Sequence, residues 1–374
     1  MINKERLLKN FLEVLSIKSP SRNEEEITRV AGLKLKELGL SVNVDNCGTR
    51  FGSNSGNLIG FYRTKNPSGG KPLFLAAHVD TVGLNGDLIP VISDGKIYNK
   101  NRKCILGGDD KVAVAAIIEA LTVVKENNLS TGDIYVIFTI CEEIGLLGSK
   151  CFDMNLVKAD YGFALDSDGD IGEIINRGPY QNSINADFKG KEAHAGVEPE
   201  KGINAIKAAS IALCNMKLGR IDRESTSNVG KITGGTARNI VAGESKIELE
   251  ARSLNLSRLD RITGSMVNCL KKSASKTGAV LDYEIIREYD GFEVSKDELP
   301  VVVAEHAIKK LGIKPRIASS GGGSDVNIFN SKGKKSVNLS SGMEKIHTSD
   351  EYVKVEEIIK LAELIIEICK YPVR

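Results

Sequence analysis

Residues 73–81 read LFLAAHVDT, an apolar run of strand length that ends on a histidine and continues into an aspartate. Similar apolar runs occur at 58–61, 134–140 and 161–165, with helical patterns between them. The clearest helix is predicted at 112–125, which is rich in Ala and Val and follows GGDDK. Apolar strands that alternate with helices predict an α/β fold, with a mixed, mostly parallel sheet sandwiched by helices. In such sheets the site lies at the carboxyl ends of the strands.

The pattern changes between residues 179 and 293. It gives strand, helix, strand, strand, helix and strand, at 183–188, 202–216, 227–233, 245–252, 256–277 and 280–287. This order predicts a small α+β (ferredoxin-like) sandwich, with an antiparallel sheet and two helices on one face.

The last part of the chain has a helix at 299–311, a strand at 335–339 and a closing helix at 354–371. These elements resume the first pattern. We therefore predict a discontinuous main domain, 1–178 and 294–374, and an inserted domain, 179–293. A chain of 374 residues exceeds what one hydrophobic core usually fills, which agrees with two domains.

Charge and cysteine content exclude several classes of protein. The 51 basic and 49 acidic residues nearly cancel to a net charge of +2, so neither a nucleic acid nor a membrane surface is an expected partner. The N-terminal residues form an amphipathic helical pattern and not a signal peptide. Seven cysteines without a CxxC pair argue against a disulfide framework or a thiolate zinc site. These features predict a cytoplasmic protein.

His78 ends the strand that begins at residue 73, and Asp80 lies two residues further on the same face. A carboxylate there can accept the imidazole N–H that does not face a metal. The alternative is a half-buried histidine beside an aspartate that caps a helix.

Paired acids follow at two further places. Asp109 and Asp110 stand at the start of the 112–125 helix, where ordinary N-capping is the alternative to metal binding. Glu142 and Glu143 follow an apolar strand, and adjacent buried carboxylates normally need a cation or a proton. One of them can ligate a metal while the other serves as a general base.

Asp166 follows another short strand, and His347 lies in a polar loop after the strand at 335–339. The other two histidines are His194, in a loop of the inserted domain, and His306, which lies on an apolar helix and is interpreted as structural. Together, the strand ends carry two histidines and three carboxylates. One bridging aspartate, with one His and one carboxylate for each ion, would complete a two-zinc site, in which cobalt or manganese can substitute.

The motifs HVDTV, GGDDK, EEIG, ALDSD, KGKEAHAG, RNIV, GGGSD and HTSDEYV occur in this order along the chain. The sequence resembles the M20 metallopeptidases, and within them the peptidase T-like (tripeptidase-like) branch. The resemblance implies that two zinc ions are held by His78, Asp109, Glu143, Asp166 and His347. It also implies that Asp109 bridges the ions and that the Asp109–Asp110 peptide bond is cis.

The same resemblance assigns further roles. Glu142 is the implied general base, and Asp80 is implied to orient His78. The inserted domain resembles a lid and dimerisation domain, so a homodimer is implied, in which His194 stabilises the oxyanion, often in the partner's site. Asn239 and Arg252 resemble a substrate-binding pair, although Asn239 could be a turn residue and Arg252 could form an exposed ion pair. Gly323 is implied to supply a backbone donor near the substrate.

Two departures bear on substrate recognition. Related carboxypeptidases have an arginine before the triple glycine, where this chain has Ser319 and Ser320, and many relatives have proline where it has Ala242.

These features predict a two-metal peptidase that cleaves short peptides, specifically a tripeptide aminopeptidase. The alternatives are an N-acyl amino-acid amidohydrolase or desuccinylase with the same metal set, and an M42-type aminopeptidase. The predicted insert argues against the M42 type. A non-catalytic, metal-stabilised binding protein is the remaining alternative.

Overall fold

The computed structural model describes residues 1–83 and 86–372. The chain forms two compact units. The first contains residues 1–177, 293–319 and 324–374, and the second contains 178–292 and 320–323. This division differs from the predicted one chiefly in the glycine loop 320–323, which groups with the second unit.

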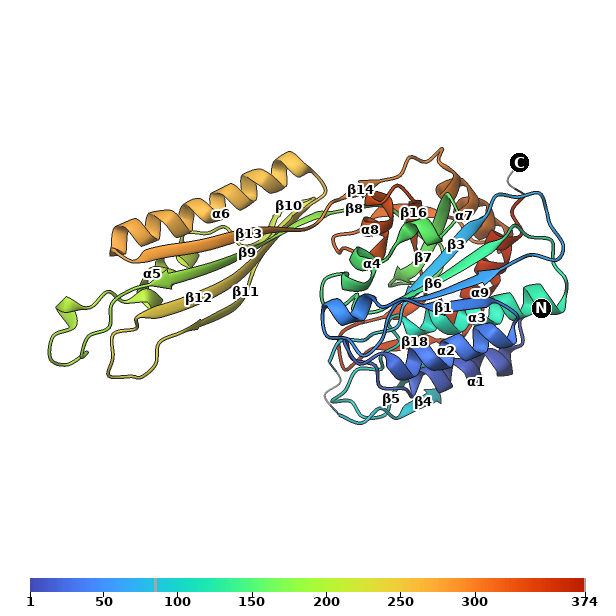
Figure 1. The fold of residues 1–374 in the computed structure, drawn as a ribbon, viewed down its shortest axis with the longest axis horizontal. Coiled ribbons are helices and arrows are strands. Elements are labelled where there is room, and N and C mark those ends of the chain that lie inside the picture. The colour runs from blue at the N-terminus through green and yellow to red at the C-terminus, as the bar shows by residue number, and fades with distance from the viewer. Residues whose placement is uncertain (84–85, 373–374) are drawn as a thin grey trace. The chain divides into compact units, whose positions relative to one another are not determined.

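The first unit is built on a nine-stranded sheet (Figure 1). Its central strands β6, β3, β7 and β16 are parallel to one another, while β1, β2 and part of β8 pair antiparallel. The predicted mixed, mostly parallel sheet is therefore confirmed. The order is β1 (Ser41–Val44), β2 (Leu58–Tyr62), β6 (Ile134–Thr139), β3 (Leu73–His78), β7 (Tyr161–Ser167), β16 (Lys335–Ser340), β8 (Glu173–Gly178) and β14 (Phe292–Glu293), with β15 (Arg316–Ser319) paired to β8.

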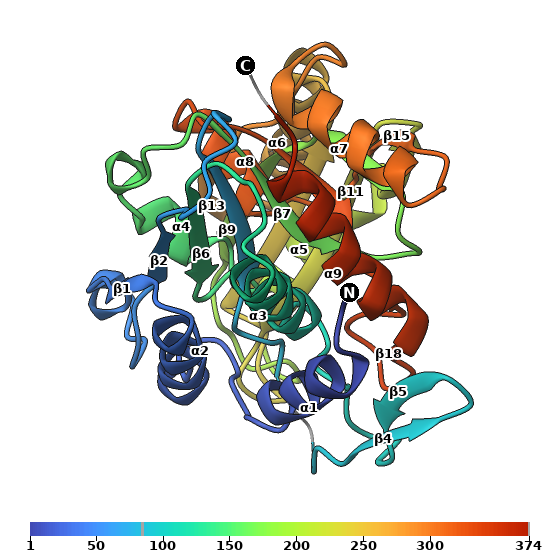
Figure 2. The same ribbon diagram turned by 90° about the vertical axis from the view of Figure 1, so that its right-hand side faces the viewer.

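Helices cover both faces of this sheet. One layer, nearest the viewer in Figure 2, contains α1 (Lys4–Leu15), α2 (Glu25–Glu37), α3 (Lys111–Glu126), α7 (Leu299–Lys310) and α9 (Val355–Cys369). The short helices α4 (Leu147–Cys151) and α8 (Asp325–Ser331) lie outside this layer and pack against each other. A helix that is apolar on all sides is stable only when buried. That description fits α3, which contacts α1, α9 and β3 and buries Lys111 and Glu119 with its apolar residues.

A small four-stranded sheet was not predicted. Its order is β17 (Met343–Glu344), β18 (Tyr352–Lys354), β5 (Lys96–Asn99) and β4 (Pro90–Ser93). Short strands of mixed composition give a weak periodic signal, and their pairing joins segments far apart in sequence. This sheet matters for function because β17 and β18 flank the loop that carries His347.

The second unit has the predicted order of elements, with one additional short strand, β10. Its sheet runs β10-β11-β12-β9-β13, and all four pairings are antiparallel. Alternate residues of β9 and β12 pack with the alanines of α5 and one face of α6. The elements are β9 (Tyr180–Lys189), α5 (Ala205–Cys214), β10 (Gly219–Asp222), β11 (Ser225–Gly234), β12 (Glu244–Ser253), α6 (Leu256–Thr277) and β13 (Val280–Tyr289).

One disulfide bond joins Cys47 to Cys151. The sequence does not predict this bond, because the two cysteines are 104 residues apart and only the fold brings η1 (Cys47–Arg50) to α4. Cysteine usage therefore no longer supports a reducing compartment.

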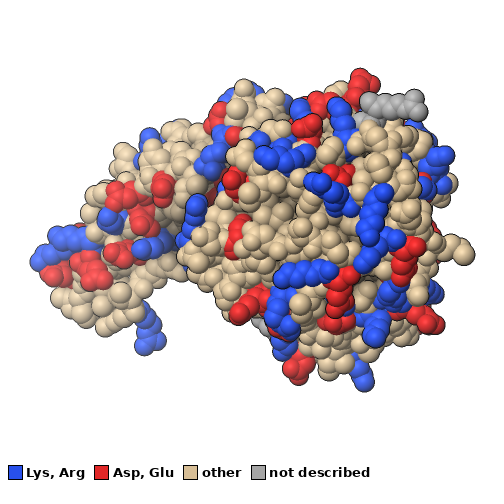
Figure 3. All heavy atoms as spheres, turned by 45° about the vertical axis from the view of Figure 1, so that its right-hand side comes forward, with Lys and Arg blue, Asp and Glu red and all other residues tan. Residues whose placement is uncertain are grey.

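The surface and the helices add two observations. In residues 1–83 and 86–372, no helix has both the length and the apolar character needed to cross a bilayer. Figure 3 shows basic and acidic side chains interspersed on one face of the molecule.

Candidate metal centre

The ends of the four central parallel strands bring the predicted site residues together. Because β6, β3, β7 and β16 are parallel neighbours, their carboxyl ends meet at one edge of the sheet. His78 is the last residue of β3, and Asp166 is the last but one of β7. Glu142 and Glu143 follow β6, and His347 lies in the loop after β16.

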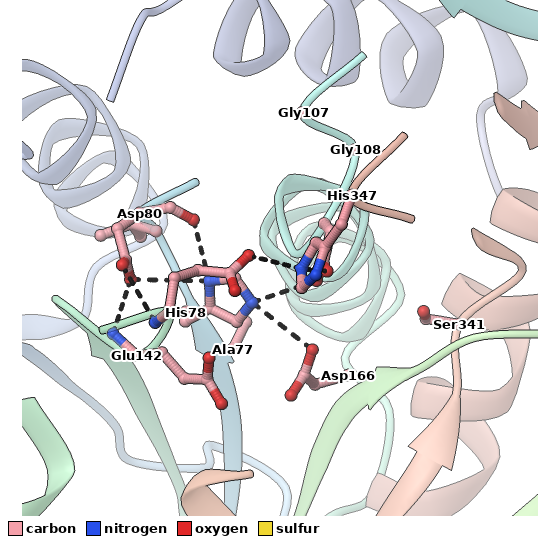
Figure 4. A network of polar contacts seen from close by, with 12 residues as sticks. Ala77, His78, Asp80, Gly107, Gly108, Glu142, Asp166, Ser341 and His347 are labelled. Atoms are coloured by element: carbon pink, nitrogen blue, oxygen red, sulfur yellow. Dashed lines mark hydrogen bonds and ion pairs between the residues drawn. The ribbon is translucent and has the colours of Figure 1, made fainter. Parts of the chain in front are cut away.

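The first group of possible ligands contains His78, Asp109 and Asp166. Figure 4 labels His78 and Asp166. The Nε2 atom of His78 is 3.0 Å from Oδ1 of Asp109 and 3.4 Å from Oδ1 of Asp166. The three ligand atoms of this group, one nitrogen and two carboxylate oxygens, lie within 4.8 Å of one another. They could therefore bind one cation together.

The second group contains Asp109, Glu143 and His347. The Nε2 atom of His347 is 2.9 Å from Oε1 of Glu143 and 3.2 Å from Oδ2 of Asp109. Asp109 therefore directs one carboxylate oxygen to each group. A single carboxylate shared between two ligand sets is the arrangement expected for a bridging ligand.

The pKa values in this region are displaced by burial and by the neighbouring charges. Burial acts to lower the pKa of His78, but the nearby carboxylates of Asp109, Asp166 and Asp80 raise it well above its usual value. Hydrogen bonds to Asp109 and Glu143 raise the pKa of His347 to about 10. Burial raises the pKa of Asp166 to about 7. The displaced pKa values reflect imidazole and carboxylate groups that are held close together at this edge of the sheet.

The donor set fits two divalent cations. Asp110 precedes α3 but makes no capping hydrogen bond, and neither of its carboxylate oxygens has a hydrogen-bond partner within the described residues. Burial raises the pKa of Asp110 well above its usual range. Ordinary N-capping therefore does not explain this pair of acids.

Imidazole nitrogens with carboxylate oxygens form a donor set suited to zinc. The Asp109–Asp110 peptide bond is cis, as the resemblance implies.

Asp80 makes different contacts from those expected. The Nδ1 atom of His78 is 2.9 Å from the backbone oxygen of Asp80, while the nearer carboxylate oxygen is 3.6 Å away. The carboxylate of Asp80 instead accepts hydrogen bonds from the backbone N–H groups of Glu142 and Glu143, at 2.9 and 3.2 Å. Asp80 thus orients His78 mainly through its backbone, and its side chain fixes the loop that carries both glutamates.

Glu142 lies beside the first ligand group. Burial raises the pKa of its carboxyl group well above the usual value, and the charges of His78, Asp166 and Asp325 act on it from nearby. A carboxyl group with a raised pKa, next to possible metal ligands, is suited to accept and return a proton. Its role as general base stays a prediction.

Asp325 was not predicted as a side chain of the site, since GGGSD was expected to supply only backbone donors. Burial raises the pKa of its carboxyl group, which accepts a hydrogen bond from Thr139 at the end of β6. Its other oxygen has no partner in the part of the chain that the structure describes. The sequence signal that could have pointed to Asp325 is Ser324, which caps the short apolar helix beginning at Asp325.

The remaining predicted residues lie in the second unit. His194 is exposed, and its Nδ1 atom accepts a hydrogen bond from the Gly196 N–H at 3.1 Å, so a neutral ring carries its proton at Nε2. Asn239 is near His194, because its backbone oxygen accepts from the Ala195 N–H.

The structure does not bring Arg252 to Asn239. Arg252 lies at the far end of β12 and forms an ion pair with Glu250 at 3.0 Å, which matches the ordinary alternative for this residue. Gly323 packs against Tyr289, with no room for a Cβ atom.

Known proteins resemble this chain over nearly its whole length. A model of the peptidase family M20/M25/M40 matches residues 74–371. Protein YqjE of Bacillus subtilis strain 168 is 40% identical over 368 residues, which is 98% of each chain. The crystal structure of aminopeptidase PepT from Bacillus cereus ATCC 10987 has a TM-score of 0.87 at 40% identity and covers 99% of this chain and 98% of its own. A tripeptidase from Staphylococcus aureus Mu50 has a TM-score of 0.92 at 37% identity, with the same coverage.

Proposed function

Because the chain belongs to the peptidase family M20/M25/M40 and is a peptide hydrolase, we propose that it removes the N-terminal residue of short peptides, tripeptides in particular. The observation that carries this proposal is the Asp109 carboxylate shared between two ligand groups, with Glu142 alongside. The likeness to an aminopeptidase and to a tripeptidase, each covering 99% of the chain, supports the substrate class.

His78, Asp109 and Asp166 would hold one divalent cation, and Asp109, Glu143 and His347 the other, with zinc as the proposed metal. When bound, the two cations would polarise the scissile carbonyl group and make a water molecule more acidic. Glu142 would take the proton from the water whose oxygen attacks the scissile carbonyl carbon, and would deliver that proton to the amine as the C–N bond breaks. Asp80 keeps Glu142 in place through the loop N–H groups.

The second unit is proposed to complete the site and to form a homodimer. The Nε2–H of His194 is an available donor for the developing oxyanion. Asn239, Arg252 and Gly323 are proposed to contact substrate. The support for a dimer is the edge strand β13, which presents Val280, Tyr283 and Ile285 to solvent.

Removal of the metal is expected to abolish tripeptide hydrolysis, and added zinc is expected to restore it, with cobalt and manganese as substitutes. The reason is that both ligand groups combine imidazole nitrogen with carboxylate oxygen. The measurement is release of the N-terminal residue from a panel of dipeptides, tripeptides and longer peptides, after chelation and after addition of each metal.

The same panel separates the competing functions. Blocking the α-amine of each tripeptide by acetylation is the matched control, and it should stop hydrolysis. Cleavage of N-acyl amino acids alone would replace the aminopeptidase with an amidohydrolase. A metal-loaded protein that cleaves neither class would favour the binding protein.

The variant His194→Ala is expected to lower kcat by roughly 10²–10³-fold, because it removes a donor aimed at the oxyanion. Hybrid dimers test which chain supplies the histidine. We expect co-expression of differently tagged His194→Ala and Glu142→Gln chains to restore about a quarter of wild-type activity, since half the dimers are hybrids with one complete site. A mixture no more active than either parent would contradict sharing of His194 between subunits.

A further inference from the structure

We propose that Glu351 is a positioning residue that holds the segment of Asp109 against the segment of His347, and so forms the second cation site before metal binds. This inference rests on the proposed two-metal function. Glu351 belongs to the segment HTSDEYV and is not itself a member of either ligand group.

The carboxylate of Glu351 accepts three backbone hydrogen bonds from one loop. The N–H of Gly107 donates to Oε2 at 2.8 Å, and the N–H groups of Gly108 and Asp109 donate to Oε1 at 2.7 and 3.2 Å. The side chain is buried, with 1% of the residue exposed. Water therefore has little access to these bonds, and loss of the carboxylate would leave buried N–H groups without this acceptor.

Glu351 is itself held in place. Its N–H donates to the Thr348 backbone oxygen, which closes a turn directly after His347. The next residues form β18, which pairs with β5 and β17. The carboxylate thus connects the Asp109 loop, labelled at Gly107 and Gly108 in Figure 4, to an anchored segment that follows His347.

Gly107 and Gly108 allow the Glu351 carboxylate to approach the loop closely. Gly107 has a φ of +72°, which favours glycine. A Cβ atom on Gly108 would be 3.1 Å from Oε1 of Glu351 and 3.1 Å from Cγ2 of Val353. A side chain at position 108 would therefore push the carboxylate away from the N–H groups.

This contact bears on the cations because it joins two members of one ligand group. His347 is exposed on its loop, so its distance to Asp109 is not fixed by burial of the ring. Glu351 provides that constraint through the backbone. An amide in its place has one acceptor oxygen and an NH₂ group, which would oppose at least one of the three donors.

Glu351→Gln is expected to weaken binding of the cation held by Asp109, Glu143 and His347 by roughly 10- to 100-fold, the effect of losing a group that supports a ligand. Binding at the other ligand group should change much less. The measurement is calorimetric titration of the metal-free protein with zinc, without peptide. In kinetics, kcat at limiting zinc should fall and excess zinc should recover it, while KM stays near the wild-type value.

The matched control is Glu357→Gln, because Glu357 is also buried and accepts a backbone N–H, from Ile171, away from the ligands. Its cation affinities should equal those of the wild type. Gly108→Ala, which displaces the carboxylate without removing it, should reproduce the selective loss in milder form and keeps the test valid if Glu351→Gln fails to fold.

An equal loss in both glutamate variants, or no loss in Glu351→Gln and Gly108→Ala, would overturn the positioning role. Failure of the proposed peptidase function has a separate signature. In that case the wild type binds two cations but hydrolyses no peptide, and the selective effect of Glu351→Gln on cation binding is still measurable.

Discussion

Replacing Glu142 with glutamine is expected to lower kcat for tripeptide hydrolysis by roughly 10²–10⁴-fold, the range of a positioned general base. The amide keeps the size of the side chain but cannot take a proton from water. Since the backbone N–H of residue 142, and not its side chain, binds Asp80, the loop should keep its position. Both cations should remain bound, and KM should change little.

The adjacent residue supplies a matched control. Glu143→Gln alters the same loop, but its carboxylate contacts His347 in the second ligand group. Its defect should therefore appear as weaker cation binding that excess zinc partly corrects. Steady-state kinetics and metal analysis of both variants make the comparison. A Glu142→Gln variant with wild-type kcat would remove Glu142 from the mechanism.

Asp109→Asn is expected to lower the stoichiometry from two tightly bound cations to at most one, and activity by roughly 10³-fold or more, because several kcal/mol of charge stabilisation are lost. Each oxygen of Asp109 serves one ligand group. The asparagine variant offers an oxygen to one group and an NH₂ to the other, which repels a cation. Metal content after dialysis and turnover at saturating peptide measure the effect.

Asp168→Asn is the control for Asp109→Asn. Asp168 comes directly after β7, the strand that contains Asp166. It is exposed and belongs to neither ligand group. Its variant should bind both cations and turn over normally. If Asp109→Asn still bound two cations as tightly as the Asp168 variant does, Asp109 would not be the bridging ligand.

The central strands and most helices could be predicted because burial gives them long, uniform patterns. The run ending at His78 was predicted at its observed bounds, Leu73–His78, and the helix Leu256–Thr277 was also predicted at its observed bounds. Strand parallelism then implied that residues after different strands would meet. That is why five residues from distant parts of the sequence could be predicted as one site.

Contacts that depend on folded geometry could not be predicted. The acceptor role of Glu351 toward residues 107–109 spans more than 240 positions, and nothing in HTSDEYV distinguishes it from an exposed acid. The Cys47–Cys151 bond and the small sheet of β17, β18, β5 and β4 have the same cause. Asp80 was expected to contact His78 with its side chain. Alternation along a strand predicts the direction of the Asp80 side chain, but not which Asp80 atom lies nearest to the imidazole ring.

The strand order of the first unit has a consequence for biosynthesis. β16 lies between β7 and β8 in the sheet, yet the ribosome produces it after residues 178–292. The second unit is almost continuous in sequence, so its sheet can close while β7 still has an unpaired edge. That edge, and the face of α3 that α9 later covers, remain exposed during this interval. The unit whose synthesis begins first is therefore the one whose folding finishes last.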